Sequence, residues 1–381
     1  MSKKKIGVIT MNKVWNFGSA LQAYATQYII ESMGYECEII DYTYPNIEHA
    51  AYQNKILPPK DLSLKEILHL FISKIKLSII NRKKIDLFES FYTENYHCSP
   101  KRYNSRAELL KEVPQYDVYM TGSDQVWNPN YIGFDTNFML AFAPKQVKKI
   151  SYASSFAISD IPVYFKNIYK NELSNYQFIS VRESSGKALI KELTGKDAEI
   201  VCDPTLLLNA EQWRKLAQKS IFKIDEPYLL VYLVGYAYNP YPEIYNYIEC
   251  VNNKLNLPII YLNAKSGYLK KKYREINVPD KGPNEFLYLI SHASFIITDS
   301  FHGTAFSLNF GVRFISCIDE RKENSDSRIL NLLRIVGLEN RAVVYNSHEP
   351  ISYEELPQEY NQLLDGYRKK SIEFLKNSIE S

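Results

Sequence analysis

Cysteine is scarce in this sequence of 381 residues, and the few cysteines are not arranged for a structural role. Their number is odd and no Cys-x-x-Cys pair occurs, which argues against a disulfide framework and against a zinc site. They are Cys37, Cys98, Cys202, Cys250 and Cys317. No Asp-x-Asp pair or histidine cluster stands out either, so we expect no metal. The natural compartment for such a chain is the reducing cytosol.

Long apolar runs and an excess of charge of one sign are also absent. No stretch approaches the roughly 20 apolar residues that span a bilayer. The apolar run Ile6–Thr10 follows a basic start but is too short for a signal peptide. The net charge is only +3, which gives no reason to expect nucleic acid as a partner.

What the sequence does contain is enough material for two domains. Single hydrophobic cores stop growing at roughly 250–300 residues, and this chain is longer. Hydrophobic residues make up 45% and charged residues 23%, values typical of a folded protein rather than a disordered one. The 31 tyrosines have two open interpretations: surfaces that stack on sugars or line interfaces, or a compositional bias of the organism.

Short apolar runs alternate with helical patterns in the first half of the chain. A strand is predicted at Lys5–Thr10, a helix at Ser19–Met33 that Gly34 ends, and a strand at Glu36–Asp41. Such a β-loop-α-β unit normally forms a right-handed crossover in a parallel sheet. Further apolar runs that end in small or polar residues follow at 118–122, 149–153, 178–182 and 199–202.

A second β/α series begins after Asp203–Trp213, which we interpret as a linker because proline and polar residues interrupt the pattern. The predicted strands are 228–234, 257–262, 295–298 and 313–317, and the predicted helices are 241–255, 286–291 and 352–381. The expected fold is α/β, with two doubly wound Rossmann-like domains and a cleft between them. The expected boundaries are 1–205, 206–350 and a C-terminal helix at 351–381, which we expect to cover one domain.

One segment departs from this order. From Leu64 to Ile85, apolar residues recur at helical spacing on one face while lysines and arginines occupy the other. This predicts a basic amphipathic insertion at about 60–90. Two interpretations remain open: a helix that lies on a membrane surface, and a helix packed on the sheet with a solvated basic face.

The most informative segment is Phe295–Gly311, a predicted strand that runs directly into a helix with His302 at the junction. Small and polar residues fill the turn: Ser300, Phe301, His302, Gly303 and Thr304. Backbone N–H groups at a helix start bind anions, and the carboxyl end of a strand is where α/β proteins bind ligands. We therefore predict an anion site here, with hydroxyl donors from the turn and His302 as acid or cation.

Two arginines could add cations to this site. Arg182 stands where the run 178–182 meets a predicted helix start, and a guanidinium binds carboxylate or phosphate in a bidentate manner. A surface salt bridge with Glu183 is the alternative. Arg328 is a candidate for a third cation, with simple solvation as its alternative.

Two turns of the first half carry further candidates. The turn with Asn16, Gly18 and Gln22 follows the first strand but matches neither GxGxxG nor GxxxxGK[ST], so a dinucleotide or P-loop site is unsupported. The second turn offers a carboxylate, amides and an indole suited to sugar hydroxyls, and stabilisation of the loop by capping is the alternative. Its candidates are Gly122, Ser123, Asp124 as a base, and Trp127.

Taken together, these motifs resemble the polysaccharide pyruvyl transferase family. The matching segments are Asn16–Gln22, Gly122–Asn128, Ser180–Glu183, Asp203–Thr205, Gly282–Leu287 and Asp299–Thr304. They run in order over nearly the whole chain, from residue 6 to about residue 341. Each is weak alone, but the ordered set is specific.

The resemblance implies a fold similar to two-domain GT-B glycosyltransferases and a cytosolic transferase. Phosphoenolpyruvate is the implied donor, no cofactor is needed, and a glycan or lipid-linked sugar of a surface polysaccharide such as a capsule is the implied acceptor. The implied product is a pyruvate ketal. His302, Arg182 and Asp124 are then the expected catalytic residues. Peripheral contact with the inner membrane face or with polysaccharide assembly machinery is a further expectation.

Ser300 departs from the family pattern, since some members carry an arginine at this position. Either Arg328 compensates for the missing charge, or the chain belongs to a branch with altered chemistry. Two other functions stay open at this point: a GT-B-like glycosyltransferase that uses a nucleotide sugar, and a non-catalytic glycan-binding or assembly protein.

Overall fold

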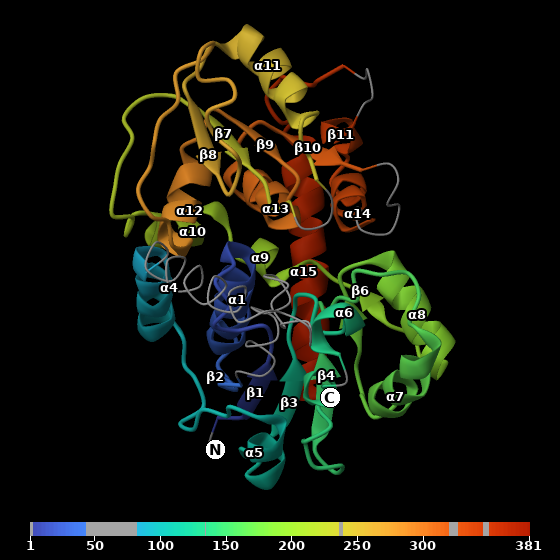
Figure 1. Ribbon diagram of the computed structural model, residues 1–381. Helices are drawn as coiled ribbons and strands as arrows, with labels where there is room; N and C mark the ends of the chain where they lie inside the picture. The colour runs from blue at the N-terminus through green and yellow to red at the C-terminus, as the bar shows by residue number, and fades with distance from the viewer. Residues whose placement is uncertain (1–2, 43–81, 134, 236–238, 320–326, 346–349) are drawn as a thin grey trace, which may run out of the picture.

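The computed structural model describes residues 3–42, 82–133, 135–235, 239–319, 327–345 and 350–381. Two α/β lobes lie one above the other (Figure 1). The N-terminal lobe is built on strands β1–β6 and the C-terminal lobe on β7–β11. Most of the amphipathic helix expected at 64–85 falls outside the described residues.

The N-terminal lobe has a parallel sheet in the order β2-β1-β3-β4. Isolated parallel bridges, Ile150 to Phe178 and Ser154 to Val181, continue it toward the pair β5–β6. The strands are β1 (Lys5–Ile9), β2 (Glu36–Ile39), β3 (Val118–Thr121), β4 (Lys148–Ser151), β5 (Ser180–Val181) and β6 (Glu199–Ile200). All six lie within the runs predicted from the sequence, give or take one residue.

The helices of this lobe begin where the sequence provides caps. Asn16 caps the first helix by accepting a hydrogen bond from the Ser19 amide, as a short polar side chain does at a helix start. The helices are α1 (Phe17–Ser32), α4 (Arg82–Asn95), α5 (Arg106–Lys111), α6 (Pro129–Ile132), α7 (Val163–Leu173) and α8 (Ser184–Thr194), with a 3-10 turn η1 (Thr136–Met139). Helices α9 (Pro204–Leu207) and α10 (Ala210–Ala217) follow at the junction of the lobes (Figure 1).

The C-terminal lobe has a parallel sheet in the order β11-β10-β9-β7-β8. The strands are β7 (Leu229–Tyr232), β8 (Ile259–Leu262), β9 (Phe295–Thr298), β10 (Phe314–Ile318) and β11 (Ala342–Val344). The helices are α11 (Ile244–Leu255), α12 (Pro283–Ser291), α13 (Phe301–Phe310) and α14 (Ser327–Ile335), with a 3-10 turn η2 (Glu339–Arg341). The predicted α/β fold with two parallel sheets is thus confirmed.

Each sheet has a point where the strand order reverses. In the N-terminal lobe it lies between β1 and β3, and in the C-terminal lobe between β7 and β9. Open α/β sheets bind ligands in the crevice at the carboxyl ends of the strands at such a point. Helices α1 and α13 begin just after β1 and β9, at these two points.

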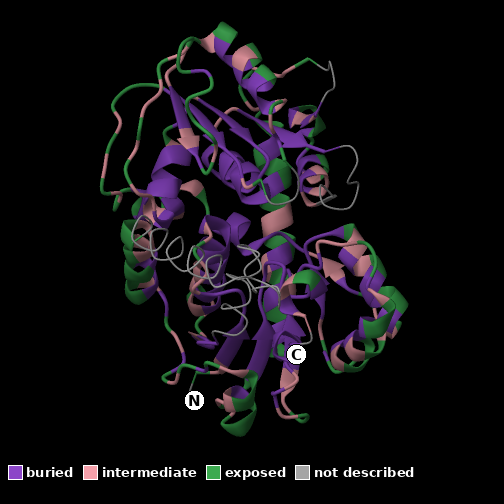
Figure 2. Cartoon of the chain, viewed as in Figure 1, coloured by how far each residue is buried: buried purple, intermediate pink, exposed green. Residues whose placement is uncertain are grey.

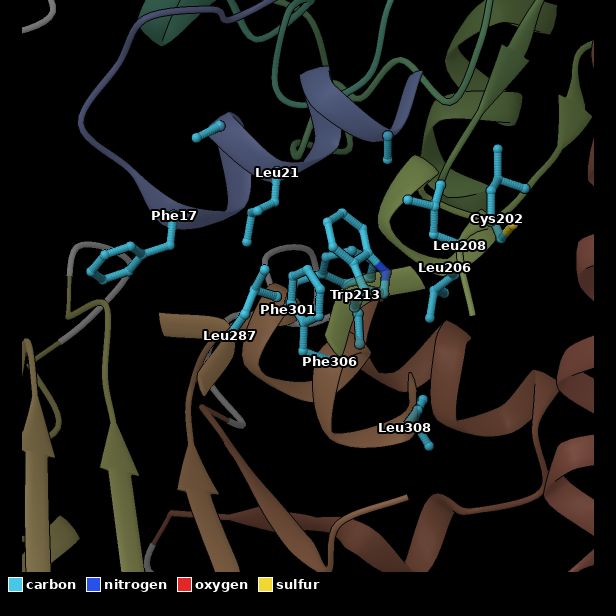
Figure 3. Packing of buried hydrophobic residues seen from close by; sticks show 14 of the residues in the cluster. Phe17, Leu21, Cys202, Leu206, Leu208, Trp213, Leu287, Phe301, Phe306 and Leu308 are labelled. Atoms are coloured by element: carbon cyan, nitrogen blue, oxygen red, sulfur yellow. The ribbon is translucent and has the colours of Figure 1, made fainter. Parts of the chain in front are cut away.

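A continuous apolar core joins the two lobes. One cluster of buried side chains runs from Val8 of β1 through α1 to Leu230 of β7. Phe17 of α1 stacks on Phe286 of α12, with ring centres 4.8 Å apart and planes at 8°. Figure 3 shows Phe17 and Leu21 opposite Leu287 and the aromatic residues of the C-terminal lobe. Most strand residues are buried, while exposed residues gather on the outer helices (Figure 2).

The last helix, α15 (Glu359–Glu380), runs along both lobes (Figure 1). Arg368 donates hydrogen bonds to the Leu206 carbonyl and to Asn309 of α13, while the Ile379 carbonyl accepts one from Lys4 beside β1. The helix therefore bridges the halves rather than covering one domain as expected. Among the described residues, no helix is both long enough and apolar enough to cross a membrane.

Candidate active site

His302 lies where the two lobes meet. It occupies the first turn of α13, whose N-cap Ser300 accepts a hydrogen bond from the Gly303 amide. Its imidazole packs directly on Gly18 in the first turn of α1, and a Cβ atom at position 18 would overlap the ring. The two helix starts that follow the strand-order reversals are therefore in contact. Gly18 is predicted from the sequence as a site residue, and this contact requires its missing side chain.

Arg182 approaches this point from the end of β5 and is almost completely buried. Its Nη1 donates a hydrogen bond of 2.5 Å to Asp203, and its Nη2 lies 3.6 Å from an Asp124 oxygen. The guanidinium carbon is 5.0 Å from the centre of the Phe301 ring, a cation–π distance. Nε and Nη2 are buried and have no hydrogen-bond partner among the described residues. These two atoms form one edge of the guanidinium.

Asp203 is the buried counter-charge of Arg182. Its Oδ1 accepts hydrogen bonds from the amide and hydroxyl of Thr205, and its Oδ2 accepts one from Ser123 at 3.0 Å. Burial alone would raise its pKa, but the charges of Arg182 and His302 and the Thr205 hydrogen bonds outweigh burial and lower the pKa to about 2. The carboxyl is therefore ionised at neutral pH.

Asp124 follows β3 and has a left-handed backbone, with φ of 74°, an uncommon conformation for a residue other than glycine. One carboxylate oxygen accepts a hydrogen bond from the Ser19 hydroxyl of α1 and the other from the Gln125 amide. Burial would raise its pKa, but Arg182, His302 and Ser19 together lower it. Asp124 is thus a second ionised carboxylate within reach of Arg182.

The imidazole of His302 is set between these charges. Its Nε2 is buried without a hydrogen-bond partner and lies 3.9 Å from Asp203. Burial lowers the pKa of His302, and the positive charges of Arg182 and Arg328 lower it further, while Asp203 and Asp124 oppose the shift. The free protein therefore holds a neutral imidazole near neutral pH. An anion bound nearby would raise the pKa and favour protonation.

The other predicted residues of the α13 turn have contacts within the protein. The Ser300 hydroxyl caps the helix, and the Thr304 hydroxyl contacts the Ser300 carbonyl and the Ser316 hydroxyl. Gly303 packs closely on Thr298. The Thr304 hydroxyl is thus engaged within the protein, while the Ser300 hydroxyl accepts a hydrogen bond and its role as a donor to a ligand stays a prediction. The amides of the first helical turn remain the anion-binding groups of this segment.

The predicted residues of the N-terminal lobe divide into two groups. Gln22 is buried and donates to Thr10, and its carbonyl oxygen has no partner in the described part of the chain. Asn12, which the sequence did not predict, follows β1 and is only 2% exposed, and neither its side-chain nitrogen nor its side-chain oxygen has a described partner. Asn16 and Gly122 act locally: Asn16 caps α1, and Gly122 leaves room for Thr10.

Trp127 does not reach this site. Its side chain is completely buried, and its indole N–H donates to the Phe138 carbonyl. The ring lies 5.3 Å from Phe156 and 5.8 Å from Tyr176, centre to centre. Trp127 is therefore a core residue of the N-terminal lobe rather than a surface that grips sugars.

Sequence reasoning missed three residues of the site. The sequence pattern places Asp203 in a linker. In the structure, Asp203 caps the start of α9 and pairs with Arg182. A signal was present, because Asp203 directly follows a predicted strand, as Asp124 does. Ser19 and Asn12 lacked such a signal, since their roles depend on contacts across the sheet. No cluster of metal-binding side chains occurs among the residues that the structure describes.

The two parallel sheets and the polar group between them define an α/β enzyme with two Rossmann-like domains. The chain belongs to the polysaccharide pyruvyl transferase family, whose model matches residues 16–321. It is therefore a transferase, as the resemblance predicted. Membership of this family implies a pyruvyl donor and a polysaccharide acceptor.

Solved structures resemble the chain at low sequence identity. UDP-GlcNAc 2-epimerase from Methanocaldococcus jannaschii is 14% identical, with a TM-score of 0.47 over 99% of this chain and 93% of that one. UDP-N-acetylglucosamine 2-epimerase from Rickettsia bellii is 11% identical, with a TM-score of 0.48 over 100% and 98%. Arabidopsis thaliana UGT89C1 complexed with quercetin is 11% identical, with a TM-score of 0.44 over 100% and 95%. A search of curated proteins gave no significant match.

Proposed function

We propose that this transferase moves a pyruvyl group from phosphoenolpyruvate to a sugar of a cell-surface polysaccharide or its glycan precursor, forming a cyclic pyruvate ketal. The observation that carries the proposal is the buried Nε–Nη2 edge of Arg182, which has no hydrogen-bond partner among the described residues. Two parallel N–H donors bind a carboxylate in a bidentate manner. Phosphoenolpyruvate carries such a carboxylate next to its phosphate.

The phosphate of the donor would lie toward α13 and α14. The first-turn amides of α13 attract an anion. Arg328 of α14 carries a buried Nε without a described partner, and its charge acts on His302. Arg328 would thus supply the charge that the family pattern with arginine in place of Ser300 supplies elsewhere. Donor phosphate beside His302 would raise the imidazole pKa and prepare it as an acid.

The proposed reaction uses residues of both lobes. His302 gives a proton to the methylene carbon of phosphoenolpyruvate, and a sugar hydroxyl forms a bond to the adjacent carbon while Asp124 accepts its proton. A second hydroxyl attacks the same carbon as the bond to phosphate breaks. One of the two hydroxyl protons replaces the proton that His302 gave to the new methyl group, and the other leaves on phosphate. Asn12 and Gln22 offer amide groups to the acceptor hydroxyls.

The donor site is tested by calorimetry with phosphoenolpyruvate. Arg182→Lys removes the two-atom edge but keeps the charge, and we expect its affinity to fall by about 10- to 100-fold, the worth of a hydrogen bond to a charged group. Arg102→Lys is the matched control, because Arg102 is exposed. Equal affinity of the Arg182 variant and the wild type, or a preference of the wild type for a nucleotide sugar, would contradict the proposal.

The acid is tested by phosphate release in the presence of phosphoenolpyruvate and a panel of glycan precursors. We expect His302→Ala to abolish release, because the methylene carbon is then not protonated. His292→Ala, at an exposed histidine after α12, should leave the rate unchanged. Turnover by the His302 variant at the wild-type rate would exclude His302 as the acid.

A further inference from the structure

One lysine from each lobe lies near the contact between α4 and α12, beside the start of α1. Lys84 of α4 holds its ammonium 5.5 Å from the centre of the Phe17 ring and 5.9 Å from that of Phe88. Lys281 directly precedes α12. Its neighbour Gly282 packs so tightly on α4 that a Cβ atom there would lie 2.8 Å from the Leu87 Cβ. The two lysines are therefore brought together by the contact between α4 and α12.

This lysine pair is incompletely neutralised. Within the described residues, neither ammonium forms an ion pair or a hydrogen bond. Burial lowers the pKa of both lysines, and the charge of Lys281 lowers that of Lys84 further. Asp280 offsets part of the effect on each. Two partly desolvated cations with one nearby carboxylate favour the binding of an added anion.

A cavity of about 250 Å³ begins at Lys281. It lies at the carboxyl end of β8, and its polar lining comes from Tyr261, Asn263, Ser266, Asn277 and Lys281. The Tyr261 hydroxyl is buried and has no partner in the described part of the chain. Lys281 of the lysine pair therefore borders a space that can hold a group with both polar and apolar parts.

The helices beside the lysine pair, α4 and α12, lie on the opposite side of α1 and α13 from α8 and α14, the helices next to the donor arginines (Figure 1). In Figure 1, α4 and α12 flank α1 and α13 on the left, whereas α8 and α14 lie on the right. Phe17, under Lys84, is next to Gly18, on which His302 packs. A molecule that reacts at His302 and Asp124 and extends away from the donor arginines thus extends toward α4, which carries Lys84 (Figure 1).

We propose that Lys84 and Lys281 bind a phosphate group of the acceptor, so that the substrate is a phosphorylated sugar rather than a neutral glycan. The cavity beyond Lys281 then holds the group that is linked to this phosphate. This assignment rests on the proposed function for the identity of the reacting sugar, but the anion site itself does not. A nucleoside diphosphate and a lipid diphosphate share the recognised chemistry.

The anion site is tested by titrating the full-length protein with inorganic pyrophosphate, with and without phosphoenolpyruvate. We expect Lys84→Met and Lys281→Met each to weaken pyrophosphate binding by about tenfold or more, with phosphoenolpyruvate binding unchanged. Lys83→Met, at the exposed neighbour on α4, is the control and should bind as the wild type does. Unchanged phosphoenolpyruvate affinity and melting temperature show that the variants are folded.

The outcomes separate the two proposals. No pyrophosphate binding, equal binding by the lysine variants, or an equal loss in Arg328→Met would overturn the lysine site. A wild type that binds pyrophosphate through the lysines but not phosphoenolpyruvate counts against the proposed function alone. Uridine diphosphate and farnesyl diphosphate then distinguish a nucleoside diphosphate from a lipid diphosphate as the ligand. Lysine-dependent binding of one of them that is tighter than the binding of pyrophosphate supports the cavity assignment. Binding of both that is no tighter than the binding of pyrophosphate overturns it.

Discussion

Two buried aspartates at the carboxyl ends of strands have opposite pKa shifts, and the difference lies in one arginine. Asp203 pairs with Arg182, and its pKa falls to about 2 although it is buried. Asp299, after β9, accepts hydrogen bonds from the amides of Val234 and Gly235, and burial raises its pKa to about 6. Amide hydrogen bonds thus fail to offset the burial that a guanidinium offsets.

The raised pKa of Asp299 predicts a pH-dependent stability. A carboxyl whose pKa is higher in the folded than in the unfolded state contributes stability that is present below pH 3.8 and lost as the pH rises through about 6. The wild type should therefore lose about 2 kcal/mol of unfolding free energy between pH 4 and pH 7 relative to Asp299→Asn. Urea unfolding of both proteins across this range measures the difference.

The control for this prediction is Asp197→Asn. The Asp197 side chain is 82% exposed and pairs with Lys191 at the surface, so its removal should change stability by less than about 1 kcal/mol. Parallel stability curves for the wild type and the Asp299 variant would contradict the assignment of the raised pKa.

The proximity of the predicted site residues could be expected from the sequence where each residue follows a strand, while their catalytic roles stay predictions. His302, Arg182 and Asp124 each follow a strand, and the structure brings them together. The sequence pattern missed Asp203, because the pairing with Arg182 spans 21 positions and depends on where β6 lies. Trp127 could not be assigned, since an indole suits a sugar site and a core equally well.

At the scale of elements, the contact between the starts of α1 and α13 links the two lobes. Gly18→Ala adds a methyl group where the His302 imidazole already lies, so the histidine must move. We expect phosphate release to fall by about 100-fold, because a displacement of about 1 Å costs a catalytic group this much. Steady-state kinetics of phosphate release measure this loss.

Gly366→Ala is the matched control for this substitution. Gly366 lies within α15, and a Cβ atom there would meet nothing within 4 Å. Alanine in a helix is favoured over glycine, so the control should be as active as the wild type and slightly more stable. A fully active Gly18 variant would show that the position of His302 is not needed for catalysis.

The elements themselves were predictable because apolar periodicity is a local property. The strand β9 has the predicted bounds, and α12 begins three residues before its predicted start, at Pro283. Asp203–Trp213 connects the lobes, but it contains α9 and the capped helix α10, which the sequence pattern did not predict. Short helices of this kind carry too few residues for a period to appear.

At the scale of the molecule, an apolar core joins the two lobes beside the polar site. Trp213 of α10 lies 5.1 Å from Phe306 of α13, centre to centre, within the same cluster that reaches Val8 of β1. Domain interfaces within a chain are usually more polar than this. The sequence could not reveal it, because the residues that meet come from segments far apart in the chain.

This shared core predicts that the two lobes unfold together. One cluster of buried side chains contains residues of both sheets, such as Ile6 and Ile296, and α15 is hydrogen-bonded to both lobes. Differential scanning calorimetry should therefore show one transition whose calorimetric and van't Hoff enthalpies agree. Phe17→Ala removes the ring between the lobes and should cost about 3–5 kcal/mol. Tyr164→Ala, at an exposed ring on α7, should cost far less. Two separate transitions in the wild type would mean that the lobes are independent domains.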